Sequence, residues 1–161
     1  IDTCGICENC LQGYYNACLK RKGLGRTVHG VFRKKINLQY KLIHKIPEKV
    51  TTQTAVLCEP FASCYHAVVE RSKVQNGETV LVFGPGIIGF FVAFLSLSRG
   101  AEVTVLGLST DIKRLDICQK IGCKIKVIET NKNSDLSKFF LSNLYKVNIH
   151  FFCSGNTNLA R

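Results

Sequence analysis

The stretch Thr79-Val80-Leu81-Val82-Phe83-Gly84-Pro85-Gly86-Ile87-Ile88-Gly89 decides the fold. Its first five residues form a short run of β-forming, mostly apolar side chains, typical of a strand, and residues 87–98 are apolar on nearly every side, which indicates a buried helix. The spacing G-x-G-x-x-G between strand and helix is typical of a dinucleotide-binding turn. Gly84 would make the turn, Gly86 would admit a pyrophosphate, and Gly89 would let helix and strand pack closely. Free N–H groups at the helix start, at Ile87 and Ile88, would bind the phosphates. The pattern also leaves open a turn of the same fold that binds no nucleotide.

Strands and helices alternate after this turn. The sequence predicts further strands over Glu102–Leu106, Lys124–Ile128 and Val147–Cys153, with helices over Asp111–Ile121 and Leu136–Tyr145. Such alternation indicates βαβ units and a parallel sheet, so residues 51–161 are predicted to form an α/β domain.

The preceding part of the chain is less regular. Residues 51–73 begin with the helix-capping residues Thr51-Thr52 and are predicted to be helical. We expect Pro60 to break this helical stretch, which then continues over Phe61–Arg71. Residues 1–50 are predicted to be a separate unit, with a cysteine-rich loop over 1–25 and short strands over Gly30–Ile36 and Leu42–Ile46.

Four cysteines near the start form the most specific motif, C-x2-C-x2-C-x7-C, at Cys4, Cys7, Cys10 and Cys18. Zn²⁺ accepts four thiolates at tetrahedral corners, and a site closed by four sulfurs holds structure and performs no chemistry. The following Lys20-Arg21-Lys22 would offset the net negative charge. The x7 gap disfavours an iron–sulfur cluster, whereas unliganded thiols, another metal or a disulfide stay open.

Composition and charge limit the other possibilities. The 161 residues are 46% hydrophobic and carry a net charge of +11, which is globular composition and permits an anionic partner such as nucleic acid. Nine cysteines, an odd number, in mainly apolar settings indicate a reducing, cytoplasmic location. The apolar stretch Val80–Ser98 is long enough for a membrane span, but its glycines favour a strand, a turn and a buried helix.

The end of the second strand bears on the choice of cofactor. A carboxylate here would read the ribose of NAD, but the sequence has Ser109 at this place, and Asp111 is better placed as a helix cap. Arg114, with Lys113 beside it, could bind a 2′-phosphate. The sequence therefore predicts use of NADP(H) at least as readily as NAD(H), although an ordinary charged helix surface is the alternative.

Taken together, these motifs resemble the zinc-dependent medium-chain alcohol dehydrogenases. The resemblance rests on the cysteine motif and on four short segments, Gly23-Leu24-Gly25, Ile43–Pro47, Cys58-Glu59-Pro60 and His66-Ala67-Val68. It continues through the glycine turn and Lys113-Arg114-Leu115. Glu59-Pro60 is similar to the sorbitol and threonine dehydrogenase branch.

The resemblance implies an incomplete Rossmann sheet preceded by part of a GroES-like β domain, in a fragment that lacks both ends. It implies hydride transfer between a secondary alcohol or polyol and NAD or NADP at a catalytic zinc. Glu59 would be a ligand of that zinc or hold its water, while the family's other zinc ligands have no counterpart in this sequence. We therefore expect the chain alone to be inactive, and the intact protein to be a homodimer or homotetramer. A basic zinc module that binds nucleic acid, or a non-catalytic nucleotide-binding relic, are the alternatives.

Overall fold

The structure is a computed structural model, and it describes residues 2–128 and 146–154. The chain divides into two compact units, Ile1–Val50 and Thr51–Arg161, which are described separately. The predicted helix Leu136–Tyr145 lies outside the described residues.

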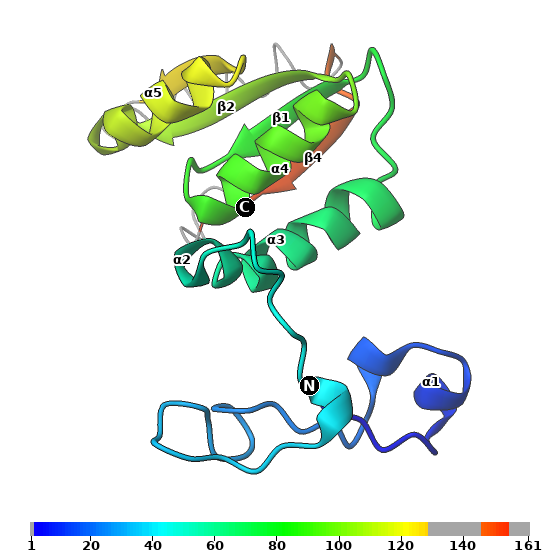
Figure 1. Cartoon of the computed structure of the whole chain (residues 1–161). Coiled ribbons are helices and arrows are strands. Elements are labelled where there is room, and N and C mark those ends of the chain that lie inside the picture. The colour runs from blue at the N-terminus through cyan, green and yellow to red at the C-terminus, as the bar shows by residue number, and fades with distance from the viewer. Residues whose placement is uncertain (1, 129–145, 155–161) are drawn as a thin grey trace. The chain divides into compact units, whose positions relative to one another are not determined.

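A parallel four-stranded sheet forms the centre of the second unit (Figure 1). Its strands are β1 (Thr79–Phe83), β2 (Glu102–Leu108), β3 (Lys124–Ile128) and β4 (Ile149–Phe152), in the order β3-β2-β1-β4. The chain moves from β1 outward to β3 and then returns to the other side of β1, so the strand order reverses beside β1. In open α/β sheets of this kind, ligands bind at the carboxyl ends of the strands at such a reversal.

The core reflects the alternation of side chains along the strands. Val80 and Val82 of β1 face one large apolar cluster, whereas Leu81 and Phe83 face a smaller one. The large cluster also contains residues of α4 (Ile87–Ser98) and α5 (Ile112–Lys120), so both helices cover the same face of the sheet. Right-handed crossovers that run in one direction, from β1 to β2 to β3, require this arrangement.

The helical segment before the sheet differs from its prediction at Pro60. Helix α2 (Thr52–Ala55) is capped by the Thr51 hydroxyl, which accepts a hydrogen bond from the Thr54 N–H at 3.2 Å. Helix α3 (Cys58–Tyr65) then contains Pro60, so the expected break there is wrong. Pro60 lies in the first turn, where a helix has no acceptor for an N–H group. The π-helix η3 (His66–Arg71) continues α3.

The first unit consists mainly of loops, with α1 (Glu8–Leu11) and the 3₁₀ helices η1 (Tyr15–Ala17) and η2 (Tyr40–Leu42). The strands expected over 30–36 and 42–46 are wrong, because the described residues of this unit pair only in isolated bridges, Asp2 with Lys22 and Leu24 with Val28. That this unit belongs to a GroES-like domain stays a prediction.

The apolar stretch Val80–Ser98 is divided between β1, the glycine turn and α4. Within the described residues, we find no helix with the length and apolar character required to cross a membrane.

Candidate functional site: a four-thiol cluster and a glycine turn at the sheet edge

The four cysteines of the motif come together in the first unit. Their Sγ atoms all lie within 4.8 Å of one another. The Sγ atoms of Cys7 and Cys10 are 3.5 Å apart, those of Cys4 and Cys18 are 3.6 Å apart, and the Cys4–Cys10 and Cys7–Cys18 pairs are each 4.0 Å apart. A tetrahedral zinc site with Zn–S bonds of about 2.3 Å has sulfur–sulfur edges of about 3.8 Å. The cluster therefore has the dimensions of a zinc site, and none of its cysteines forms a disulfide.

The backbone around the cluster favours thiolates. Hydrogen bonds from the backbone, first of all at Cys10, lower the pKa of the Cys7 thiol to about 6. The Cys4 N–H donates to Cys18 Sγ at 3.4 Å. Burial and the neighbouring sulfurs raise the pKa of Cys10 to about 12, so this thiol needs a cation to ionise.

The basic run that follows the cluster also has a structural role. The Arg21 guanidinium donates to the carbonyl oxygen of Asn16 at 2.9 Å, and Lys22 exchanges backbone hydrogen bonds with Asp2. Arg21 therefore supports the cysteine loop, in addition to its charge.

The glycine turn connects β1 to α4 at the carboxyl edge of the sheet. Gly84 has φ +96°, a backbone conformation that favours glycine. A Cβ atom on Gly89 would lie 1.9 Å from the Gly84 carbonyl oxygen, so only glycine allows this packing. A Cβ atom on Gly86 would meet nothing within 4 Å, which leaves open space beside the first turn of α4. The helix itself offers no acceptor to its first N–H groups, including those of Ile87 and Ile88.

The end of β2 lies next to this turn. A small cavity lies at the carboxyl ends of β1, β2 and β3, and it is lined by Phe83, Gly84, Leu106, Gly107, Leu108, Asp111, Ile128 and Ser154. A second hollow is lined by residues of the turn, α4 and α5, namely Pro85, Gly86, Ile87, Phe90, Arg114 and Ile117. The structure thus brings the glycine turn, Asp111 and Arg114 to one edge of the sheet.

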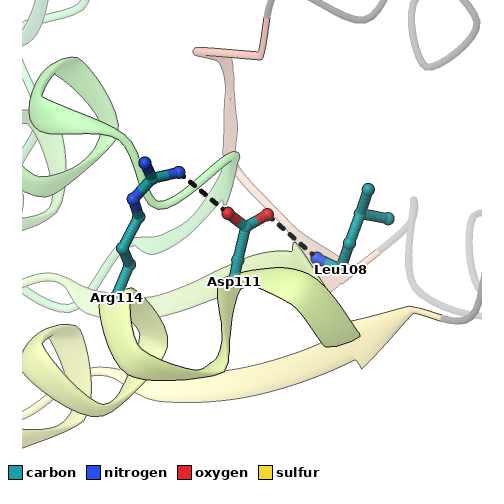
Figure 2. A network of polar contacts seen from close by, with 3 residues as sticks. All are labelled: Leu108, Asp111 and Arg114. Atoms are coloured by element: carbon teal, nitrogen blue, oxygen red, sulfur yellow. Dashed lines mark hydrogen bonds and ion pairs between the residues drawn. The ribbon is translucent and has the colours of Figure 1, made fainter.

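Asp111 and Arg114 are paired, which the sequence reasoning missed. The Arg114 guanidinium donates to Asp111 Oδ1 at 3.0 Å, and the Leu108 N–H donates to Asp111 Oδ2 at 3.3 Å (Figure 2). Asp111 is at the N-cap position of α5, but its side chain makes no capping hydrogen bond to a backbone N–H group of that helix. Ser109 begins the 3₁₀ helix η4 (Ser109–Asp111) and is exposed. The i,i+3 spacing of aspartate and arginine was the available signal for this pair.

Glu59 lies in the first turn of α3 and is exposed. In the part of the chain that the structure describes, the four cysteines are the one group of three or more potential metal ligands. Glu59 is therefore not brought together with further ligands, and its catalytic role stays a prediction.

The comparisons with known proteins agree with this geometry. The chain is 32% identical over 160 residues to a sorbitol dehydrogenase of Halalkalibacterium halodurans, an alignment that covers 98% of the chain. It is also 32% identical over 136 residues, 84% of the chain, to a D-arabitol-phosphate dehydrogenase of Enterococcus avium. The resemblance to the zinc-dependent medium-chain alcohol dehydrogenases that the sequence motifs indicated is thereby confirmed. The chain spans 46% of the length of the sorbitol dehydrogenase and 38% of that of the D-arabitol-phosphate dehydrogenase. No family model matches the chain.

Solved structures extend the likeness to the fold of the family. An alcohol dehydrogenase of Escherichia coli CFT073, solved with NADH, is 27% identical with a TM-score of 0.80, over 96% of this chain and 45% of that protein. A zinc-binding dehydrogenase of Sinorhizobium meliloti, solved with NADP, has the same fold with a TM-score of 0.80 at 22% identity, over 99% of this chain and 47% of that protein. The predicted parallel Rossmann sheet is thereby confirmed.

Proposed function

We propose that the protein is a zinc-containing dehydrogenase that transfers a hydride between a secondary alcohol or polyol and NAD(P). The observation that carries the proposal is the glycine turn at the reversal of the parallel sheet, where Gly86 leaves open space beside the start of α4. The polyol substrate class is supported by the identity to sorbitol and arabitol-phosphate dehydrogenases.

The residues at this edge fit a dinucleotide. Gly84 and Gly89 hold the turn against β1, and Gly86, Ile87 and Ile88 present the first turn of α4, whose N–H groups and positive dipole end favour a pyrophosphate. When bound, the nicotinamide supplies the acceptor or donor of the hydride. The large side chains of Ile87 and Ile88 are exposed in the structure, and a dinucleotide would cover them.

The four-thiol cluster is proposed as a structural zinc site. Zinc there would fix the loop of residues 1–25 without an open coordination position, because all four corners are sulfurs. Glu59 is proposed to serve a separate catalytic zinc, as a ligand or through its bound water. The described residues do not by themselves form a catalytic metal centre, so we expect residues 1–161 alone to show no zinc-dependent turnover.

Two further features of the intact protein are part of the proposal. We expect a homodimer or homotetramer, measurable by light scattering, and a cytoplasmic location. The buried thiols of Cys64, Cys118 and Cys123 support a reducing compartment.

The experiment is a titration of the full-length protein with NADH and NADPH, followed by assays with secondary alcohols, polyols and primary alcohols. Saturable binding of at least one dinucleotide, weakened by Gly86→Ala, supports the proposal. Absence of binding of either dinucleotide contradicts it. If the protein instead shifts the electrophoretic mobility of DNA or RNA, with a steep dependence on salt concentration, the alternative of a basic zinc module that binds nucleic acid is favoured.

A further inference from the structure

The last turn before α5 carries a carboxylate back to the end of β2. Strand β2 ends at Leu108, and the 3₁₀ turn Ser109–Asp111 reverses the chain there. Asp111 Oδ2 accepts the Leu108 N–H at 3.3 Å, so the carboxylate lies beside the strand end although Asp111 follows it by three positions (Figure 2). The Asp111 side chain is 19% exposed, compared with 66% for Arg114.

This carboxylate lines the cavity at the carboxyl ends of the strands. The same cavity is lined by Gly84, the first glycine of the turn that would hold the pyrophosphate, and by Leu108. Asp111 is the one acidic residue among the cavity's lining residues. A dinucleotide whose pyrophosphate lies at the start of α4 places its adenosine ribose at the end of the adjacent strand, which here is β2.

We propose that Asp111 is the residue that reads the adenosine ribose, and that its pair with Arg114 makes the protein prefer NAD(H) to NADP(H). This inference rests on the proposed function. It departs from the expectation drawn from the sequence, in which Ser109 left the ribose site without an acid and Arg114 was available for a phosphate.

The preference follows from the charges. A carboxylate accepts hydrogen bonds from ribose hydroxyls but repels a 2′-phosphate, which carries a charge of about −1.5 to −2 near neutral pH. Arg114 could attract that phosphate, but its guanidinium already binds Asp111 Oδ1 at 3.0 Å. A phosphate would have to separate the pair and then lie next to the released carboxylate. Asp111 thus disfavours NADP(H) both directly and by holding Arg114.

The decisive variant is Asp111→Asn. Asparagine keeps an oxygen that can accept the Leu108 N–H, so the turn is retained, while the negative charge is removed and Arg114 is released. We expect the ratio of the dissociation constants for NADPH and NADH to fall by about tenfold or more, the size of one charge-assisted hydrogen bond gained. In the double variant with Arg114→Gln, most of the gain in NADPH affinity should be lost.

Two control variants separate this effect from general charge. Asp116→Asn removes the same charge from an exposed position of α5 and should leave the ratio unchanged. Ser109→Ala should also leave it unchanged. Circular dichroism and thermal unfolding check that each variant folds as the parent does.

The measurement is fluorescence titration of the full-length protein with NADH and NADPH. The inference is supported if the parent protein prefers NADH, and if the ratio of the dissociation constants for NADPH and NADH falls in Asp111→Asn but not in the double variant that also carries Arg114→Gln. Preference of the parent for NADPH, an unchanged ratio in Asp111→Asn, or an equal shift in Asp116→Asn overturns it while the proposed function stands. Failure of the parent to bind either dinucleotide overturns both.

Discussion

Replacing Gly89 with alanine tests the packing of the glycine turn without any ligand. The added Cβ would lie 1.9 Å from the Gly84 carbonyl oxygen, 3.1 Å from the Gly84 carbonyl carbon and 3.4 Å from Val82 Cγ1. The two nearest atoms belong to the backbone, so rotation of a side chain cannot relieve the contact. Ordinary van der Waals contact begins at 3.4 Å, so helix α4 and the turn would have to separate by about 1.5 Å.

The magnitude is the difference between two effects. Overpacking of a dense core costs about 1–3 kcal/mol, and a backbone contact this short belongs at the upper end. Alanine has a better helix propensity than glycine by about 1 kcal/mol, which partly offsets this cost. We therefore expect the free energy of unfolding to fall by about 2 kcal/mol, and Tm by about 4–8 °C for a chain of this size.

The matched control is Gly86→Ala, three residues earlier. Its Cβ meets nothing within 4 Å, so the free energy of unfolding should fall by no more than about 1 kcal/mol, the cost of a poorer N-cap residue. Urea unfolding followed by circular dichroism compares both variants with the parent. If Gly89→Ala is as stable as the parent, or Gly86→Ala is the more destabilised of the two, the packing argument is refuted.

Three further predictions concern the metal site and the surface. Cys10→Ser should release one zinc ion per chain and unfold the loop of residues 1–25, because the binding of structural zinc supplies folding free energy. Elemental analysis of the parent protein, purified without chelator, measures the zinc content. If the parent protein contains no stoichiometric zinc, the metal site is refuted. Acidification toward about pH 5 should release the zinc, because protons compete for the thiolates, and a zinc-binding dye would detect the release; full retention at that pH would contradict thiolate ligation. Glu102→Gln removes the exposed ion pair between Glu102 and Lys124, whose charged atoms are 2.9 Å apart. Urea titration should show that the free energy of unfolding changes by less than about 1 kcal/mol. A larger fall in the free energy of unfolding would contradict the expectation for an exposed ion pair.

The regular part of the fold was predictable because its signals are local. The β1 run, the glycine spacing and the apolar helix over 87–98 each specify their own conformation, and the structure has them at the predicted residues. The strands expected over 30–36 and 42–46 failed for the opposite reason, since a strand needs a partner and β-forming composition does not supply one. Pro60 was misjudged because its effect depends on its position in the helix, and the first turn tolerates it.

The candidate site was predictable where spacing alone fixes it. The four-cysteine motif predicted a cluster that the structure forms, because short spacers restrict where the sulfurs can lie. The i,i+3 spacing of Asp111 and Arg114 was a signal for their pairing that the sequence reasoning did not use. The contact of the same carboxylate with the end of β2 depends on the path of the 3₁₀ turn after Leu108, and that path does not follow from residue types. The catalytic role proposed for Glu59 stays a prediction, because it requires further zinc ligands that no local sequence pattern supplies.

The different exposure of the nine cysteines makes selective chemical labelling feasible. Cys58 is the one exposed cysteine, whereas burial raises the pKa of the thiols of Cys64, Cys118, Cys123 and Cys153 and lowers their reactivity. With zinc protecting the remaining four, a maleimide dye should attach at Cys58 alone. Because Cys58 directly precedes Glu59 in the first turn of α3, the dye would report events at that carboxylate without an engineered cysteine.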